Sequence, residues 1–206
     1  MFCRPHCASY PHGSIGRVRA RNVVAGAAVV GAVLVGHELT RAPAAPAAVD
    51  PGAVESPTIP ADAFAARVDR VVDGDTLLAW TPGATEPVRV RIIGVDTPET
   101  VKPDTPVRCY GPQASTFTKH LLPAGAVIRV AHEPGGDTDK FGRQLWDVWL
   151  PDGRFLESVL AAAGAARAYP YPPQTEYADL LAQLAGQARA AGRGLWGPPC
   201  KGNSFG

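Results

Sequence analysis

From about Ala63 onward, the sequence alternates between short strand-like runs and turn signals, and this pattern restricts the possible folds more than any other feature. The run 88–95 (VRVRIIGV) has the period of a strand, with Val88, Val90 and Ile92 expected on one face and the arginines and Ile93 on the other. Comparable runs predict further strands at 67–72, 76–80, 127–132 and 144–150.

Three helical segments are interspersed among these strands. They begin near Pro112, at Phe155 and at Thr175, and Gly164 and Gly192 end the second and third. No regular strand–helix–strand alternation is present, which argues against a parallel sheet. The pattern predicts an α+β domain in which helices pack on a small antiparallel barrel.

The N-terminal third has a different composition. Three arginines at 17, 19 and 21 precede the uncharged run 23–36 (VVAGAAVVGAVLVG), and small residues follow at 41–48 (RAPAAPAA). A basic flank, a short apolar segment and Ala-x-Ala-like sites are typical of a secretory signal. Because the run is shorter than the roughly 18–20 residues that span a bilayer, we expect residues 1–41 to be a signal peptide, or else a retained signal anchor.

The segment 42–62 is rich in Pro and Ala and has no periodicity, so we expect an extended tether between the export signal and a domain at 63–198. Residues 199–206 form a C-terminal tail in this scheme. The domain is then expected to be secreted, or tethered to the outer face of the cytoplasmic membrane.

The positions of the cysteines are consistent with an exported protein. Cys3 and Cys7 precede the apolar run, and no second ligand pair follows to complete a zinc site. Cys109 and Cys200 remain as an even pair in an oxidising compartment. We expect a disulfide between them that ties the tail to a loop of the domain.

Residues suited to catalysis, or to binding metal ions and phosphates, are concentrated in a few short stretches. Asp75 follows a Gly turn in 72–76 (VDGDT), and Asp96 closes the strand-like run, with Thr97 and Glu99 just behind it. Carboxylates and a backbone carbonyl are hard oxygen ligands that suit Ca²⁺ or Mg²⁺. Arg91 lies five residues before Asp96, and a guanidinium group is well shaped to bind phosphate.

A second stretch, 138–143 (TDKFGR), adds Arg143 beside a Gly-tightened turn. Two arginines, several carboxylates and a hard cation suit the hydrolysis of a phosphodiester. Each motif alone has a plain structural explanation, since Asp-Gly-Asp favours a turn and Asp-Thr-Pro-Glu favours a helix start. Their joint occurrence within one predicted barrel is what indicates chemistry.

With these residues in order, the domain resembles the staphylococcal (micrococcal) nuclease family, the thermonucleases, over roughly Phe64 to Trp196. The matching segments are 72–76 (VDGDT), 91–100 (RIIGVDTPET), 109–119 (CYGPQASTFTK), 139–143 (DKFGR), 169–171 (YPY) and 194–196 (GLW). The resemblance implies an OB-type barrel of five strands flanked by three helices. It also implies cleavage of DNA or RNA at the P–O5′ bond, leaving 3′-phosphate ends with little sequence preference.

The resemblance further implies a Ca²⁺ site and a general base. Asp75 and Asp96 would ligate the ion through their carboxylates, and Thr97 through its backbone carbonyl. Glu99 would hold and activate the attacking water.

Other matching residues would bind the substrate. Arg91 and Arg143 would bind the scissile phosphate, stabilise its developing negative charge and assist the 5′-oxygen leaving group. Lys140, Tyr169 and Tyr171 would bind the terminal phosphate and the nucleotide. We expect a monomer without an obligate protein partner, and DNA and RNA as its substrates.

Two departures from the family affect binding. Phe141 stands where the family has Tyr, so one phosphate-contacting hydroxyl is missing. From Ala63 onward the chain carries fifteen Lys and Arg and fifteen Asp and Glu, so the domain lacks a broad positive field. We therefore expect weak binding or a preference for short single strands, with a shallow dependence of affinity on salt.

Two other function classes remain open at this point. OB-type barrels also serve as non-catalytic modules for single-stranded nucleic acid, although the predicted acids and arginines are all present here. A structural cell-envelope protein could likewise carry such a barrel on its tether. Metal-dependent cleavage of nucleic acid distinguishes the enzyme from both.

Overall fold

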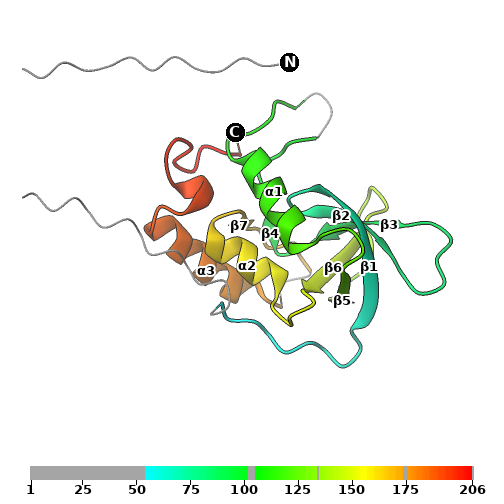
Figure 1. Cartoon of the computed structure of the whole chain (residues 1–206). Coiled ribbons are helices and arrows are strands. Elements are labelled where there is room, and N and C mark those ends of the chain that lie inside the picture. The colour runs from blue at the N-terminus through cyan, green and yellow to red at the C-terminus, as the bar shows by residue number, and fades with distance from the viewer. Residues whose placement is uncertain (1–53, 102–104, 134, 174–175, 206) are drawn as a thin grey trace, which may run out of the picture. The chain divides into compact units, whose positions relative to one another are not determined.

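The computed structural model describes residues 54–101, 105–133, 135–173 and 176–205, and its centre is a closed five-stranded barrel (Figure 1). The strands follow the order β1-β2-β3-β6-β5, and every neighbouring pair is antiparallel except β3 with β6. Their bounds are β1 Phe64–Asp73, β2 Thr76–Trp80, β3 Val88–Ile92, β5 Val127–Ala131 and β6 Gln144–Trp149. The predicted five-stranded barrel is confirmed.

A tight hairpin joins the first two strands. Asp73 is paired with Thr76, so Gly74 and Asp75 alone form the turn. The backbone N–H of Ile92 in β3 donates to the Asp75 carbonyl at 2.9 Å and holds this turn against the neighbouring strand. The hairpin therefore fixes Asp75 at one end of the barrel.

Helices pack outside the barrel. Helix α1 (Gly111–Leu121) begins with Pro in its first turn and lies against β1, whereas α2 (Leu156–Ala163) and α3 (Ala178–Ala190) pack on each other (Figure 1). Leu181, Leu184 and Ala188 form a buried stripe on α3, at the spacing of one helix face. These helices confirm the predicted α+β class.

The prediction of one continuous strand at 88–95 is wrong. Strand β3 ends at Ile92, and β4 (Val95–Asp96) instead pairs antiparallel with β7 (Arg167–Ala168). Gly94 separates β3 from β4 with φ of +75°, and a Cβ there would lie 2.6 Å from the Leu181 side chain. The break removes Asp96 from the barrel and places it opposite Arg167 in the two-stranded ladder.

The predicted division of this run into two faces also fails at its end. Arg89 is exposed, as an outward arginine should be, but Arg91 and Ile93 are buried along with Val90 and Ile92. Ile93 lies beyond the end of β3, where period-2 alternation no longer applies. Arg91 is still in β3, but Asp75, Asp96 and two backbone carbonyls surround its guanidinium.

The two ends of the described chain both contact the domain. Trp149 Nε1–H donates to the Pro57 carbonyl at 3.0 Å, so residues just before the barrel already pack on it. At the other end, Cys109 and Cys200 form a disulfide with their Cα atoms 5.7 Å apart, which anchors the tail beside the start of α1. The expected export segment lies outside the described residues. Within those residues, no helix is long and apolar enough to cross a membrane.

Candidate active site

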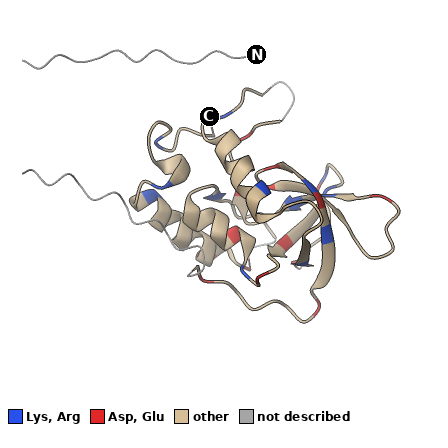
Figure 2. Cartoon of the chain, in the orientation of Figure 1, with Lys and Arg blue, Asp and Glu red and all other residues tan. Residues whose placement is uncertain are grey.

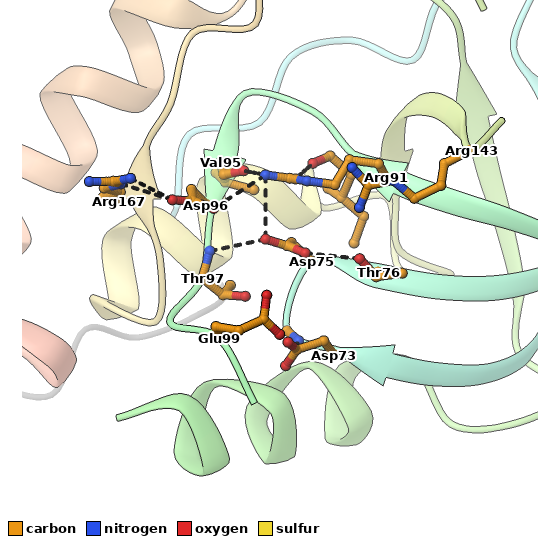
Figure 3. A network of polar contacts seen from close by, with 12 residues as sticks. Asp73, Asp75, Thr76, Arg91, Val95, Asp96, Thr97, Glu99, Arg143 and Arg167 are labelled. Atoms are coloured by element: carbon orange, nitrogen blue, oxygen red, sulfur yellow. Dashed lines mark hydrogen bonds and ion pairs between the residues drawn. The ribbon is translucent and has the colours of Figure 1, made fainter. Parts of the chain in front are cut away.

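The predicted acids and Arg91 meet at one end of the barrel (Figure 3). Asp75 comes from the β1–β2 turn, Arg91 from β3 and Asp96 from β4, with Thr97 and Glu99 directly after β4. After the break at Gly94 the chain continues as β4, which carries Asp96 out of the barrel and into the ladder with β7.

Arg91 is at the centre of this group and is only 7% exposed. Its guanidinium donates to the carbonyls of Ile92 and Val95, the latter at 2.7 Å. Its NH2 nitrogen also lies 3.4 Å from Asp75 Oδ2 and 3.5 Å from Asp96 Oδ1. Two carboxylates from separate segments therefore converge on a single nitrogen atom.

Asp75 is held by the segment that follows β4. The Thr97 N–H donates to Asp75 Oδ2 at 3.1 Å, and the Thr76 hydroxyl donates to Oδ1 at 3.0 Å. The contact needs a glycine next to Asp75, because a Cβ at Gly74 would come within 2.6–2.8 Å of the Thr97 side chain. The buried Thr97 Oγ1 has no hydrogen-bond partner among the described residues.

Asp96 has a second cationic neighbour that the sequence did not reveal. Arg167 places NH2 at 2.7 Å and Nε at 2.9 Å from Asp96 Oδ2. Burial and the nearby charge of Asp75 raise the pKa of Asp96, and Arg91 and Arg167 offset only part of that rise. Arg167 belongs to no recognisable motif, and only the β4–β7 pairing indicates its position.

Glu99 lies beside Asp73, another acid, to which the motifs assign no separate role (Figure 3). Glu99 Oε1 accepts from the Thr100 and Val101 backbone N–H groups at 3.1 and 3.0 Å. Asp73 accepts from the Thr100 hydroxyl at 2.6 Å, and burial and the Glu99 carboxyl raise its pKa. Asp73 thus fixes the loop that carries Glu99.

Arg143 immediately precedes β6, whose Leu145 is paired with Arg91 on β3. Its Nε lies 2.7 Å from Asp139 Oδ2, and its guanidinium lies over the Phe141 ring at 5.6 Å. Burial raises the pKa of Asp139, but hydrogen bonds from Arg143 and Phe141 lower it further, so that it falls below its ordinary value. An ionised Asp139 therefore holds Arg143 through both its backbone N–H and its guanidinium Nε.

The three predicted nucleotide-binding residues lie apart from this cluster. Lys140 Nζ is 5.1 Å from the centre of the exposed Phe141 ring, and Tyr171 is half-buried. Tyr169 is exposed and is connected to the cluster through Arg167, whose guanidinium lies 5.5 Å from its ring centre. Within the described residues, no hydrogen bond or ion pair joins any of the three to Asp75 or Asp96.

The ligands that this site could offer to a metal ion are oxygen atoms. In the part of the chain that the structure describes, no three His, Cys, Asp or Glu side chains gather closely enough to hold an ion by themselves. Asp75 and Asp96 supply two carboxylates, and the unpartnered Thr97 hydroxyl marks a polar position beside them. This set fits a hard cation that takes its remaining ligands from backbone carbonyls and water.

Comparison with known proteins gives the same assignment as the motifs. Residues 89–198 match the model of a family described as staphylococcal nuclease homologue. The chain belongs to the staphylococcal nuclease family. It is 47% identical over 130 residues to the thermonuclease of Staphylococcus intermedius, and 42% identical to that of Staphylococcus hyicus, covering 63% of this chain and 74% of each relative.

A more distant relative is endonuclease YncB of Bacillus subtilis (strain 168), 36% identical over 130 residues, which are 63% of this chain and 60% of that protein. The match to the staphylococcal nuclease family model includes Arg91, Asp96, Thr97, Glu99 and Arg143. It begins after Asp75, which contacts with Arg91 and Thr97 connect to the others.

Proposed function

We propose that this member of the staphylococcal nuclease family is a Ca²⁺-dependent phosphodiesterase that hydrolyses DNA and RNA at the P–O5′ bond and leaves 3′-phosphate ends. Family membership and the endonuclease and thermonuclease relatives support a nuclease. The observation that carries the finer proposal is the convergence of Asp75 and Asp96 on Arg91 NH2, at 3.4 and 3.5 Å. It brings together the anionic groups that hold a cation and a cationic group that holds a phosphate.

Asp75, Asp96 and the Thr97 carbonyl would hold the ion. When bound, Ca²⁺ supplies Lewis-acid polarisation and charge neutralisation at the phosphate. The repulsion between the Asp75 and Asp96 charges, which contributes to the raised pKa of Asp96, supports a cation there. The Thr97 N–H and Thr76 hydroxyl keep Asp75 oriented for that task.

Glu99 is proposed as the general base. The backbone N–H groups of Thr100 and Val101 both donate to Oε1 and fix the orientation of the carboxylate. A base must lie within hydrogen-bond reach of the proton that it accepts, and a fixed carboxylate meets this requirement better than a rotating one. Glu99 would take a proton from the attacking water at one of its carboxylate oxygens.

Arg91 and Arg143 are proposed to bind the scissile phosphate and to assist the departure of the 5′-oxygen when the P–O5′ bond breaks. The Ile92 and Val95 carbonyls restrain the Arg91 guanidinium, and Asp139 restrains that of Arg143 through Nε. Fixed donors stabilise developing charge without having to reorganise during the reaction. The ion pair at Nε leaves the two terminal nitrogens of Arg143 for phosphate oxygens.

Lys140, Tyr169 and Tyr171 would bind the terminal phosphate and the nucleotide beyond the scissile bond. Phe141 offers an exposed ring without a hydroxyl, so this position supports stacking and not a hydrogen bond to phosphate. We further propose that the apolar segment before the tether exports the domain, which then acts outside the cell or on the outer face of the membrane.

The test is the cleavage of denatured DNA in the presence of Ca²⁺, with product ends identified by mass spectrometry. We expect 3′-phosphate ends from the wild-type protein and a large loss of rate in Glu99→Gln and Arg143→Ala. Wild-type products that carry 5′-phosphate ends would contradict the proposed bond cleavage. Full activity of Glu99→Gln would contradict the proposed base.

A further inference from the structure

A second cationic surface lies next to Asp96, on the far side of Arg167. A pocket of about 1020 Å³ is formed by β7, the outer face of α3 and the C-terminal segment 196–205. We call it the tail pocket. Its lining includes the cations Arg167, Arg189 and Lys201 and the aromatic rings of Trp196 and Phe205, and none of its lining residues is an acid.

The charge of this region differs from that of the rest of the domain. From Leu180 to the C-terminus the chain carries three Lys and Arg and no Asp or Glu, although the domain as a whole is formally neutral. Figure 2 shows the corresponding blue positions at the end of α3 and in the loops after it. Among the described residues, Arg189 and Lys201 form no ion pair or side-chain hydrogen bond, so their charges remain available to a ligand.

Guanidinium groups and aromatic rings are combined within the tail pocket. The Arg167 guanidinium carbon lies 3.9 Å from the Phe205 ring centre, and that of Arg189 lies 5.4 Å from the Trp196 ring centre. Flat cationic and aromatic groups are the surfaces on which unpaired bases stack, and free cations at their edges bind the connecting phosphates. This combination favours a single-stranded nucleic acid over an anion without bases.

Arg167 connects the tail pocket to the candidate active site. The same guanidinium lies on Phe205 and pairs with Asp96 Oδ2. A polynucleotide that binds its scissile phosphate near Asp96 would therefore meet the tail pocket along its own length. The Cys109–Cys200 disulfide fixes the tail residue next to Lys201, so this wall of the pocket is covalently anchored to the domain.

We propose that the tail pocket is a second substrate subsite, which binds bases and phosphates of a single-stranded DNA or RNA beyond the nucleotide at the scissile bond. The proposal rests on the proposed nuclease function and extends it to substrate length. Long single strands gain affinity from Arg189, Lys201 and the two rings, whereas a dinucleotide does not reach them. A nearly neutral domain thereby gains local affinity without a broad positive field.

Substitutions at Gly186 allow a test whose expected result cannot be explained by a loss of folding. It lies in the interior of α3, is exposed, lines the tail pocket, and would have nothing within 4 Å of an added Cβ. Replacing an unstrained helical glycine with Ala or Glu favours the helix. Gly186→Glu therefore places a negative charge in the tail pocket of a protein that is at least as stable, and Gly186→Ala is its matched control.

The primary experiment measures the binding of fluorescein-labelled (dT)₁₂ to the full chain by fluorescence anisotropy in EDTA, where metal-dependent cleavage is suppressed. We expect Gly186→Glu to weaken binding on the order of tenfold, and Gly186→Ala to bind as wild type does. The double variant Arg189→Ala/Lys201→Ala should also weaken binding, and should reduce the slope of log affinity against log salt by about 1.4, or 0.7 per lost phosphate contact. Wild-type affinity in Gly186→Glu and in the double variant would overturn the proposal.

Two further measurements separate the contribution of the aromatic rings from that of the cations. An abasic 12-mer of equal charge should bind the wild type more weakly than (dT)₁₂, and equal binding would overturn the role of the rings. With Ca²⁺ present, the double variant should raise KM for (dT)₁₂ with kcat unchanged, and should leave kcat/KM for (dT)₂ unchanged. An equal loss for both lengths would overturn the assignment to a distant subsite. Failure of the nuclease function would instead appear as no cleavage by the wild type, with the binding result in EDTA unaffected.

Discussion

Asp96 and Arg167, 71 residues apart in the sequence, face each other across the β4–β7 ladder and form an ion pair at 2.7 Å. Arg167 contacts Oδ2 of the carboxylate, and the other oxygen, Oδ1, faces Arg91. The pair fixes the orientation of a proposed metal ligand from outside the barrel. Mutation of a group that orients a metal ligand typically lowers metal affinity about 10–100-fold.

Replacing Arg167 should therefore weaken metal binding. We expect Arg167→Ala to raise the Ca²⁺ concentration for half-maximal cleavage about tenfold, because Asp96 loses its fixed orientation. Isothermal titration with Ca²⁺ should show the same loss, and Arg167→Lys should recover part of it. A lower Ca²⁺ requirement in Arg167→Ala would show that removing a positive charge outweighs the loss of orientation.

Substitutions of Asp139 and of Arg143 should lower kcat by different amounts. Arg143→Ala removes a proposed transition-state donor and should lower kcat about 10²–10³-fold. Asp139→Asn keeps the guanidinium but weakens its anchor, so we expect a smaller decrease in kcat. Steady-state kinetics on one denatured DNA substrate compares the two. An equal or larger effect of Asp139→Asn would assign Asp139 a role beyond holding Arg143.

Buried acids outside the site predict a pH dependence of stability. Burial, together with the charges of Glu133 and Glu176, raises the pKa of Asp147 to about 8, from 3.8. The folded protein thus keeps a proton that the unfolded chain releases, so this contribution to stability is complete below about pH 4 and is lost as pH rises through 8. Asp147→Asn cannot lose that proton.

The free energy of unfolding of the wild type should accordingly fall between about pH 4 and 8 more steeply than that of Asp147→Asn, as urea denaturation can measure. The neighbouring Glu157, fully buried, has a pKa raised well above its ordinary value for the same reason and should retain some pH dependence in the variant. Parallel curves for the two proteins would contradict the assignment to Asp147.

The disulfide should contribute measurably to stability. It closes a loop with a sequence separation of 91 residues, and a crosslink of this kind typically stabilises a domain by about 2–4 kcal/mol. We expect Cys109→Ser/Cys200→Ser to lower the free energy of unfolding by about that amount. An unchanged unfolding midpoint would show that non-covalent contacts of the tail suffice.

The sequence predicted those parts of the site that local patterns encode. Asp75 and Asp96 follow from turn chemistry and the end of a strand, and short-range alternation indicated the barrel strands. Arg167 could not be found in this way, because its role depends on the Gly94 break and on a pairing with β4 across 71 residues. The tail pocket was also hidden, since its cations lie on three separate segments that only the folded tail brings together.

Asp75, Asp96 and Glu99 are proposed to form a Ca²⁺-dependent nuclease site. The most direct measurement is the initial rate at which the wild-type full chain cleaves denatured DNA, with Ca²⁺ and with excess EDTA, beside Asp75→Asn. We predict rapid cleavage with Ca²⁺, none above background in EDTA, and a large loss in Asp75→Asn even with Ca²⁺. Cleavage that persists in EDTA, or no cleavage by the wild type with Ca²⁺, would show that these residues do not form such a site.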